Sequence, residues 1–278
     1  MHAYAQTNVQ LFNQLRSEGY SNNDRERVRE AYEFAMHLFT GLFLPSGKTF
    51  IDHLVGTASI LASLHVSADL VIAGLIHAAY LHGDFGCRTE GISERKRNEV
   101  RDTVGAEVEK YVERYDRLLW TPQEMLTLRK LLHELSPVDR HVLLMRLANE
   151  LEHELDFAGL YYCRNESQQR WKQRYLQTHV PIMAEMAEKL GFLSLACELT
   201  KITATIARIE LPFGPCGQSK QKTAYLIKPK SYARRFRVLY YRRLLQHYVT
   251  DGAKRFYHRS SKTTRYFLRK FVEKTANI

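Results

Sequence analysis

The sequence predicts an all-α protein, and three observations support this prediction. Apolar residues recur at intervals of three and four along most of the chain, which is the spacing of one helix face. The two-residue alternation of a half-buried strand is not sustained anywhere in the sequence. Helix-start signals recur as well, because Thr121-Pro122 and Ser136-Pro137 each combine a capping residue with proline at the first helical position.

The expected helices follow one another with short polar or glycine-containing breaks. The first two cover about residues 9–15 and 24–43, and the cluster SNND can cap the second. Two more are expected at 49–64 and 68–81, and the later one is apolar almost all round, which indicates a central place in the core. The remaining helices are expected at 93–105, 106–119, from 122 onward, at 139–160, at 166–190 with a kink at Pro181, and at 192–209.

Charge is distributed unevenly along the 278 residues, whose net charge is +11. Residues 219–278 hold 17 Lys and Arg and two acids, so the preceding residues hold 24 basic and 28 acidic side chains. The segment LPFGPCGQSK contains two prolines and two glycines and predicts a linker at 211–221. We therefore expect a helical domain at 1–210 and a basic, aromatic-rich helical extension at 222–278.

Four cysteines lie far apart without a CxxC pair, so neither a zinc ribbon nor a thioredoxin-type motif is expected. Reduced thiols are the plain interpretation. The N-terminal residues lack a basic segment followed by an apolar run, and no stretch reaches the roughly 18 apolar residues that span a bilayer. We therefore expect a cytoplasmic protein without a transmembrane segment.

Two histidines stand in apolar helical surroundings, where an imidazole needs a partner. His53 and His77 lie on neighbouring predicted helices, and Asn149 follows the apolar run VLLMRLA on a later one. A metal site would need both imidazoles to converge with a carboxylate or an amide from that third helix. His53, His77 and Asn149 are therefore the candidate metal ligands, and the alternative is that the protein itself satisfies each of them.

These stretches resemble the hydrolase domain of the RelA/SpoT alarmone enzymes, within the HD-domain superfamily of metal-dependent phosphohydrolases. In that family an SGEPYIxHP segment and an AALLHD segment supply two histidines and an aspartate, and an LAD segment supplies a last aspartate. Here SGKTFIDHL supplies His53, AGLIHA supplies His77 and LAN supplies Asn149. The resemblance covers about residues 25–160 and implies an HD-domain-like helical bundle. The chain also resembles, more closely, an uncharacterised HD-like bacterial subgroup with an H…H…LAN pattern, which implies no known reaction.

The sequence departs from the alarmone-hydrolase pattern at the expected metal ligands. Ala78 stands in place of the metal-binding aspartate, and Asn149 replaces the last aspartate. Leu81 and His82 take the places of a Glu-Asp pair near the attacking water, and Leu44 that of an arginine that contacts the base. The resemblance implies a divalent metal, Mn, Fe or Zn, but two of its four expected ligands are an alkyl group and a neutral amide.

Neighbouring side chains would have to complete such a site. Glu150 and Asp84 are the candidates for orienting water, and His82 and Glu152 are alternative ligands. A charged run at the end of a helix is otherwise a solvated face. The first hypothesis for function is a metal-dependent phosphohydrolase acting on a nucleotide or another phosphorylated small molecule. The second is a catalytically reduced HD-like binding or regulatory protein that uses its basic C-terminal region to contact an anionic partner.

The basic extension interleaves Lys and Arg with Tyr and Phe. Basic residues position phosphates and aromatic rings stack on bases, so nucleic acid is one candidate partner. An acidic protein, polyphosphate or an anionic membrane surface would use the same charges. The aromatic residues also fit core contacts onto the main bundle. The candidate anion-binding residues are Arg234, Arg235, Arg237, Arg242 and Arg243.

Overall fold

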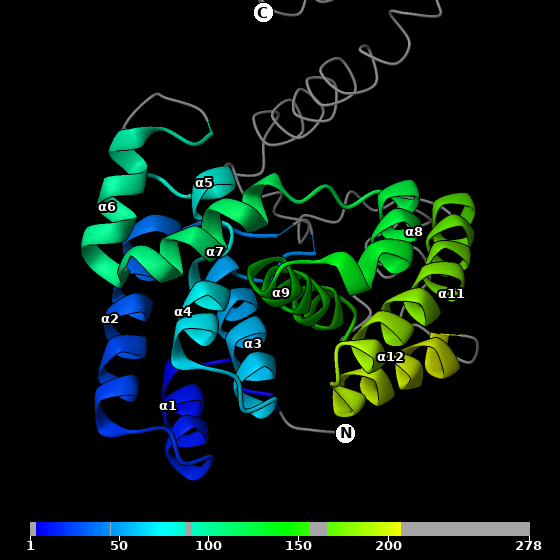
Figure 1. Ribbon diagram of the computed structural model, residues 1–278, viewed down its shortest axis with the longest axis horizontal. Helices are drawn as coiled ribbons and strands as arrows, with labels where there is room; N and C mark the ends of the chain where they lie inside the picture. The colour runs from blue at the N-terminus through cyan, green and yellow to red at the C-terminus, as the bar shows by residue number, and fades with distance from the viewer. Residues whose placement is uncertain (1–3, 45, 87–90, 156–165, 207–278) are drawn as a thin grey trace, which may run out of the picture. The chain divides into compact units, whose positions relative to one another are not determined.

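The computed structural model describes residues 4–44, 46–86, 91–155 and 166–206 (Figure 1). These residues belong to one compact unit, and their regular secondary structure is helical apart from an isolated bridge between Phe43 and Thr49. The all-α prediction is therefore confirmed. The predicted linker and basic extension lie outside the described residues, together with Arg234, Arg235, Arg237, Arg242 and Arg243.

The described helices form three groups along the chain. The first group is α1 (Asn8–Ser17), α2 (Asn22–Phe39), α3 (Phe50–Ser63), α4 (Ala68–Ile76) and α5 (Ala79–His82). The second group is α6 (Glu94–Val104), α7 (Ala106–Arg117), α8 (Pro122–Leu131), the 3-10 helix η1 (Leu132–Glu134) and α9 (Pro137–Glu154). The last group is α11 (Glu166–Lys189) and α12 (Leu193–Ile206).

Side-chain caps set the first residue of several helices. Each of these caps accepts a hydrogen bond from a backbone N–H in the first turn of the helix that follows, and they include Thr7, Ser21, Thr49, Thr121 and Ser136. Such a bond satisfies one of the four N–H groups that a helix start leaves without an intrahelical partner. The two starts with proline at the first helical position are confirmed as those of α8 and α9.

Two helix boundaries differ from the prediction. The helix expected over 24–43 ends at Phe39, and Gly41 then turns the chain with a φ of +80°. The helix expected over 68–81 is two helices, because Ala78 leaves the helical conformation with φ −93° and ψ 7°. Apolar periodicity does not reveal this break, since residues on both sides of it are buried. The break places His77 at the C-terminal end of α4.

The core is organised around α3 and α4. Every residue of α4 except Asp69 is buried, as is the whole of α3 from His53 to Ala62, so the predicted central position is confirmed. Helix α3 packs on α1, α2, α4 and α9, and α4 packs on α2, α7 and α9. Figure 1 shows α9 nearly end-on beside this pair. Polar side chains on the facing sides of these helices must therefore find partners inside the protein or in a ligand.

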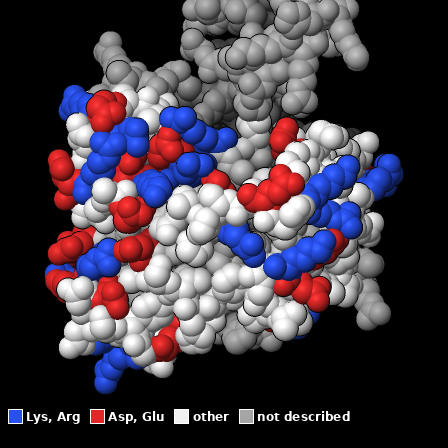
Figure 2. Space-filling model, viewed as in Figure 1, with Lys and Arg blue, Asp and Glu red and all other residues white. Residues whose placement is uncertain are grey.

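Helices α11 and α12 pack against each other and against α9, and α11 also contacts α8. Pro181 lies inside α11, which continues through it as one helix. None of the described helices is both long enough and apolar enough to cross a bilayer. On the face shown in Figure 2, basic and acidic side chains are interspersed, in keeping with the near balance of charges before residue 219.

Candidate functional site

The first turn of α3 positions His53. Thr49 caps this helix by accepting a hydrogen bond from the Asp52 N–H at 3.1 Å, and the His53 side chain is only 2% exposed. The Nδ1 atom of His53 donates to a carboxylate oxygen of Glu152 on α9. Because that oxygen accepts the bond, Nδ1 carries the proton and the lone pair on Nε2 is available to another partner.

The C-terminal end of α4 positions His77. Its Nδ1 lies 2.8 Å from the carbonyl oxygen of Gly74, one of the carbonyls that a helix end leaves without an intrahelical partner. A carbonyl only accepts, so Nδ1 of His77 is the donor and Nε2 is unprotonated in the neutral ring. The two imidazole rings meet edge to face, with 5.4 Å between the centroids of His53 and His77.

Asn149 of α9 joins the two histidines. Its amide nitrogen lies 3.0 Å from Nε2 of His53 and 3.1 Å from Nε2 of His77, and the residue is 2% exposed. Both Nε2 atoms are acceptors, so the group between them must be a donor, and the amide has one N–H for each. The structure thus brings the three predicted residues together as a His53–His77–Asn149 cluster. Their role as metal ligands stays a prediction.

Burial keeps both imidazoles of the cluster neutral. It lowers the pKa of His53 to about 3, and the charges of Lys48 and His82 act in the same direction. The pKa of His77 is also well below its usual value, first because of burial and then because of His53. A neutral imidazole either binds a metal or accepts a hydrogen bond through its free nitrogen. The cluster therefore carries no charge of its own at neutral pH.

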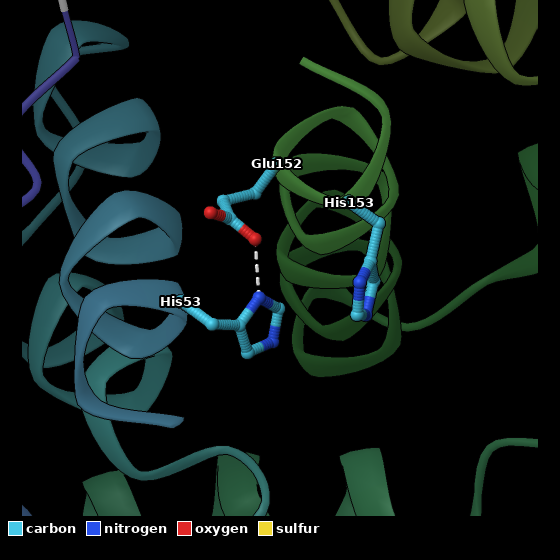
Figure 3. Close-up of side chains that lie close together, drawn as sticks. All are labelled: His53, Glu152 and His153. Atoms are coloured by element: carbon cyan, nitrogen blue, oxygen red, sulfur yellow. Dashed lines mark hydrogen bonds and ion pairs between the residues drawn. The ribbon is translucent and has the colours of Figure 1, made fainter. Parts of the chain in front are cut away.

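A second group of ligand-type side chains includes His53, together with Glu152 and His153 of α9 (Figure 3). The potential ligand atoms of these three residues lie within 4.8 Å of one another, and the His153 ring stacks on that of His53 with 4.4 Å between centroids. The carboxylate of Glu152 is fully buried and also pairs with the ammonium group of Lys48. With two donors already bound, Glu152 orients the His53 ring, as carboxylates behind ligating histidines do.

Gly56 makes room for this carboxylate. A Cβ atom at position 56 would lie 2.8 Å from both Cγ and Oε1 of Glu152, closer than real side-chain atoms approach. The absence of a side chain in the middle of α3 is therefore what lets a residue of α9 reach His53.

The remaining predicted residues have other partners. Glu150 pairs with Arg146 on the same helix. Asp84 is exposed, and its carboxylate accepts a bond from the backbone N–H two residues further on at 3.0 Å. The His82 ring lies 5.1 Å from the ring of Phe50, between centroids. Water orientation by Glu150 or Asp84 and metal binding by His82 stay predictions.

Tyr115 and Arg146 border the His53–His77–Asn149 cluster, and the Trp120 ring packs on Arg146. Nη1 of Arg146 lies 3.1 Å from the Tyr115 hydroxyl, and the Tyr115 ring lies edge to face with that of His77, 4.8 Å between centroids. The guanidinium carbon is 5.1 Å from the centre of the Trp120 ring, within cation–π distance. Among the described residues, Nε of Arg146 and Nε1 of Trp120 are buried N–H donors without a hydrogen-bond partner.

Sequence reasoning missed several of these neighbours. Arg146 lies three residues before Asn149, so helical spacing already places it on the same face of α9. Lys48, Tyr115 and Trp120 come from loops or from another helix and have no such signal. Tertiary packing alone brings these three residues to the site.

The donor set of the cluster can be compared with that of a metal site. Both histidines have the tautomer of metal-ligating histidines, with Nδ1 donating to a carboxylate or a carbonyl. The third member, however, presents an N–H₂ group to both Nε2 atoms, and Ala78 beside His77 offers no ligand atom. A divalent cation would meet a neutral set without the carboxylates that strengthen its capture. The His53–His77–Asn149 set therefore fits a metal-free, hydrogen-bonded cluster better than bound Mn, Fe or Zn.

Fold and site together define an all-α protein with a buried polar cluster where α3, α4 and α9 meet. Residues 38–118 match a domain of unknown function (DUF6817), a range that holds His53 and His77 and ends before Asn149. The chain is 26% identical over 222 residues to a probable GTP pyrophosphokinase of Mycobacterium leprae (strain TN). The matched region covers 78% of this chain and 26% of that protein. The chain is 24% identical over 181 residues to a GTP pyrophosphokinase of Streptomyces antibioticus, covering 65% and 20%.

The chain thus spans about a quarter or less of the length of these curated relatives. Their names agree with the expected relation to the RelA/SpoT enzymes, at the level of distant similarity. Membership of the HD-domain superfamily stays a prediction.

Proposed function

We propose that this chain binds a phosphorylated nucleotide at the His53–His77–Asn149 cluster and does so without a metal ion. The observation that carries the proposal is the amide of Asn149, whose two N–H groups lie between the Nε2 atoms of the two histidines. A donor in that position satisfies both lone pairs that a metal would otherwise take. The two histidines then have no free lone pair for a metal, and the hydrogen bonds to the ligand would come from the Asn149 carbonyl and from the side chains that border the cluster.

Two observations support a phosphorylated ligand. The side chains of Arg146 and Lys48 border the cluster and are 24% and 18% exposed, so neither side chain is fully enclosed by the protein. Guanidinium and ammonium groups are the usual partners of phosphate oxygens. The curated relatives are named GTP pyrophosphokinases, which makes a guanine nucleotide the first ligand to test.

The proposal is tested by calorimetric titration of the full chain with GTP, GDP and other phosphorylated nucleotides, with and without EDTA. We expect binding that EDTA leaves unchanged, no stoichiometric metal in the purified protein and no release of phosphate. His77→Ala should weaken binding, whereas Trp171→Phe, which alters a residue that is 64% exposed, should not. A stoichiometric metal together with metal-dependent phosphate release would refute the metal-free proposal.

A metal-dependent phosphohydrolase is the second candidate, and the tautomers of the two histidines favour it. His53, His77 and the carbonyl oxygen of Asn149 would hold Mn, Fe or Zn, with Glu150 or Asp84 as the proposed water-orienting groups. The metal would activate water and neutralise phosphate charge. Metal analysis followed by phosphate-release assays of His53→Ala and His77→Ala tests this candidate, which fails if no metal is bound and neither variant changes the rate.

The basic residues after position 218 support a further proposal, contact with nucleic acid or an acidic protein. The observation behind it is that this segment holds 17 Lys and Arg but only two acidic residues. An electrostatic contact of this kind weakens steeply with added salt.

A further inference from the structure

Two buried donors next to the histidine cluster lack acceptors in the part of the chain that the structure describes. They are the Nε–H of Arg146 and the indole N–H of Trp120. Buried polar groups in folded proteins nearly always have a partner, so each unpaired donor calls for an explanation. Two of them on side chains in direct contact point to one acceptor group that both would hold.

The surroundings hold the Arg146 guanidinium in a fixed orientation. Nη1 donates to the Tyr115 hydroxyl, Nη2 pairs with Glu150, and the guanidinium carbon lies 5.1 Å from the centre of the Trp120 ring. Turning Nε toward another acceptor would break the bonds to Tyr115 and Glu150. The Nε–H therefore stays where it is and is preorganised for a group that arrives from outside the described residues.

The position of this donor pair links it to the cluster. Tyr115, which accepts the bond from Arg146, also lies edge to face with His77, 4.8 Å between ring centroids. Arg146 and Asn149 lie one helical turn apart on α9. A ligand bound beside the histidine cluster on this side would lie next to Arg146 and the Trp120 ring that packs on it.

We propose that Arg146 and Trp120 form a phosphate subsite, in which the Nε–H and the indole N–H donate to oxygens of one phosphate group of the ligand. This inference rests on the proposed function for the identity of the ligand. Charge-assisted bonds from a guanidinium to phosphate oxygens are strong, and Glu150 and Tyr115 occupy Nη2 and Nη1, so Nε–H is the donor of this guanidinium that has no partner among the described residues. The indole N–H only donates and carries no charge. The subsite therefore binds a hydrogen-bond acceptor such as a phosphate oxygen.

The test uses the two tryptophans of the chain, Trp120 and Trp171. Proton–nitrogen correlation spectra of the full chain contain two indole N–H signals, and Trp171→Phe identifies the one from Trp120. Sodium pyrophosphate is the probe and sodium acetate at equal ionic strength is the control. We expect pyrophosphate to move the Trp120 signal downfield in a saturable way, with the Trp171 signal unmoved. A Trp120 signal that stays in place, or that acetate moves equally well, would overturn the subsite.

Substitutions test the two donors separately. Trp120→Phe keeps an aromatic ring and removes the N–H, and Arg146→Lys keeps the charge and removes the Nε–H. Each should weaken pyrophosphate binding about tenfold, the effect of one hydrogen bond to a charged acceptor. Trp120→Phe carries the test if Arg146→Lys does not fold. Unchanged affinity in folded Trp120→Phe protein would refute the role of the indole.

The subsite and the proposed function can fail separately. If GTP binds and the Trp120 signal does not move, the nucleotide proposal stands and the subsite falls. If pyrophosphate moves that signal and no nucleotide binds, the subsite stands and the nucleotide proposal falls.

Discussion

Exchanging Asn149 for aspartate replaces the donor between the two histidines by an acceptor of nearly the same size. In the native protein the amide donates at 3.0 Å to His53 and at 3.1 Å to His77. In Asn149→Asp a carboxylate would face two lone pairs, because the Nδ1 protons are held by Glu152 and by the carbonyl of Gly74. Both hydrogen bonds are lost, and the new charge has no counterion between the rings.

The size of the effect follows from those contacts. A buried acceptor left without its donor costs about 1–3 kcal/mol, so two of them cost about 2–6 kcal/mol. This loss applies to Asn149→Ala as well, which removes the amide and adds no charge. A divalent cation would restore the stability of the aspartate variant only, since the cation can bind two imidazoles and a carboxylate at once. At a metal concentration about 100-fold above its dissociation constant, the gain is about 2.7 kcal/mol.

Urea unfolding followed by circular dichroism measures these free energies for the wild type, Asn149→Ala and Asn149→Asp, in EDTA and with added Mn²⁺ or Zn²⁺. The measurement is made at about pH 8, where protonation of an imidazole does not substitute for the cation. We expect both variants to be less stable than the wild type in EDTA, and only Asn149→Asp to recover with metal. The reasoning is refuted if Asn149→Asp is as stable as the wild type in EDTA, or if metal stabilises the wild type equally.

Three further predictions concern other parts of the chain. Gly56→Ala should lower the free energy of unfolding by about 1 kcal/mol, because crowding of Glu152 at about 2 kcal/mol outweighs the roughly 1 kcal/mol gained in helix propensity, and an unchanged or higher urea midpoint would contradict this. Burial acts to raise the pKa of Glu109, but the hydrogen bond from Arg97 and the other contacts of this carboxylate leave it below its usual value. The folded state therefore holds the Glu109 proton less tightly than the unfolded state, so the stability that the carboxylate contributes is present above about pH 4.3 and is lost as the pH falls through its folded pKa. Glu109→Gln should accordingly cost about 2 kcal/mol at neutral pH and progressively less below about pH 4, and a cost that does not depend on pH would contradict this. Deletion of the chain from Ser219 should abolish retention on heparin at low salt, and unchanged retention would count against anion binding by the basic extension.

The candidate site could be predicted in outline because its three members lie in buried helical faces. His53, His77 and Asn149 stand out as polar residues inside apolar periodic runs, and such residues must meet partners in the interior. What each partner is depends on atoms contributed by separate helices. The sequence alone left open whether the lone pairs of the two histidines face a metal or a donor.

Tertiary packing decided the supporting contacts. Lys48 lies before α3 and Glu152 lies on α9, and their pairing depends on the close approach of these elements at Gly56. Trp120 lies between α7 and α8 and reaches Arg146 only because α7 packs on α9. Contacts of this kind have no periodic signal in the sequence, since they join residues whose separation along the chain is arbitrary.

The sequence by itself determined the all-α class, most helix starts and the positions of the buried polar residues, because capping and helical periodicity are local effects. The tertiary structure decided the break at Ala78. This break leaves His77 at the C-terminal end of α4, where its Nδ1 bonds to the Gly74 carbonyl. The tertiary structure also decided the position of the Asn149 amide between two imidazoles. The physical reason is that protonation and hydrogen bonding of a buried ring depend on every group packed around it, and those groups come from α3, α4, α7, α9 and the loop before α3.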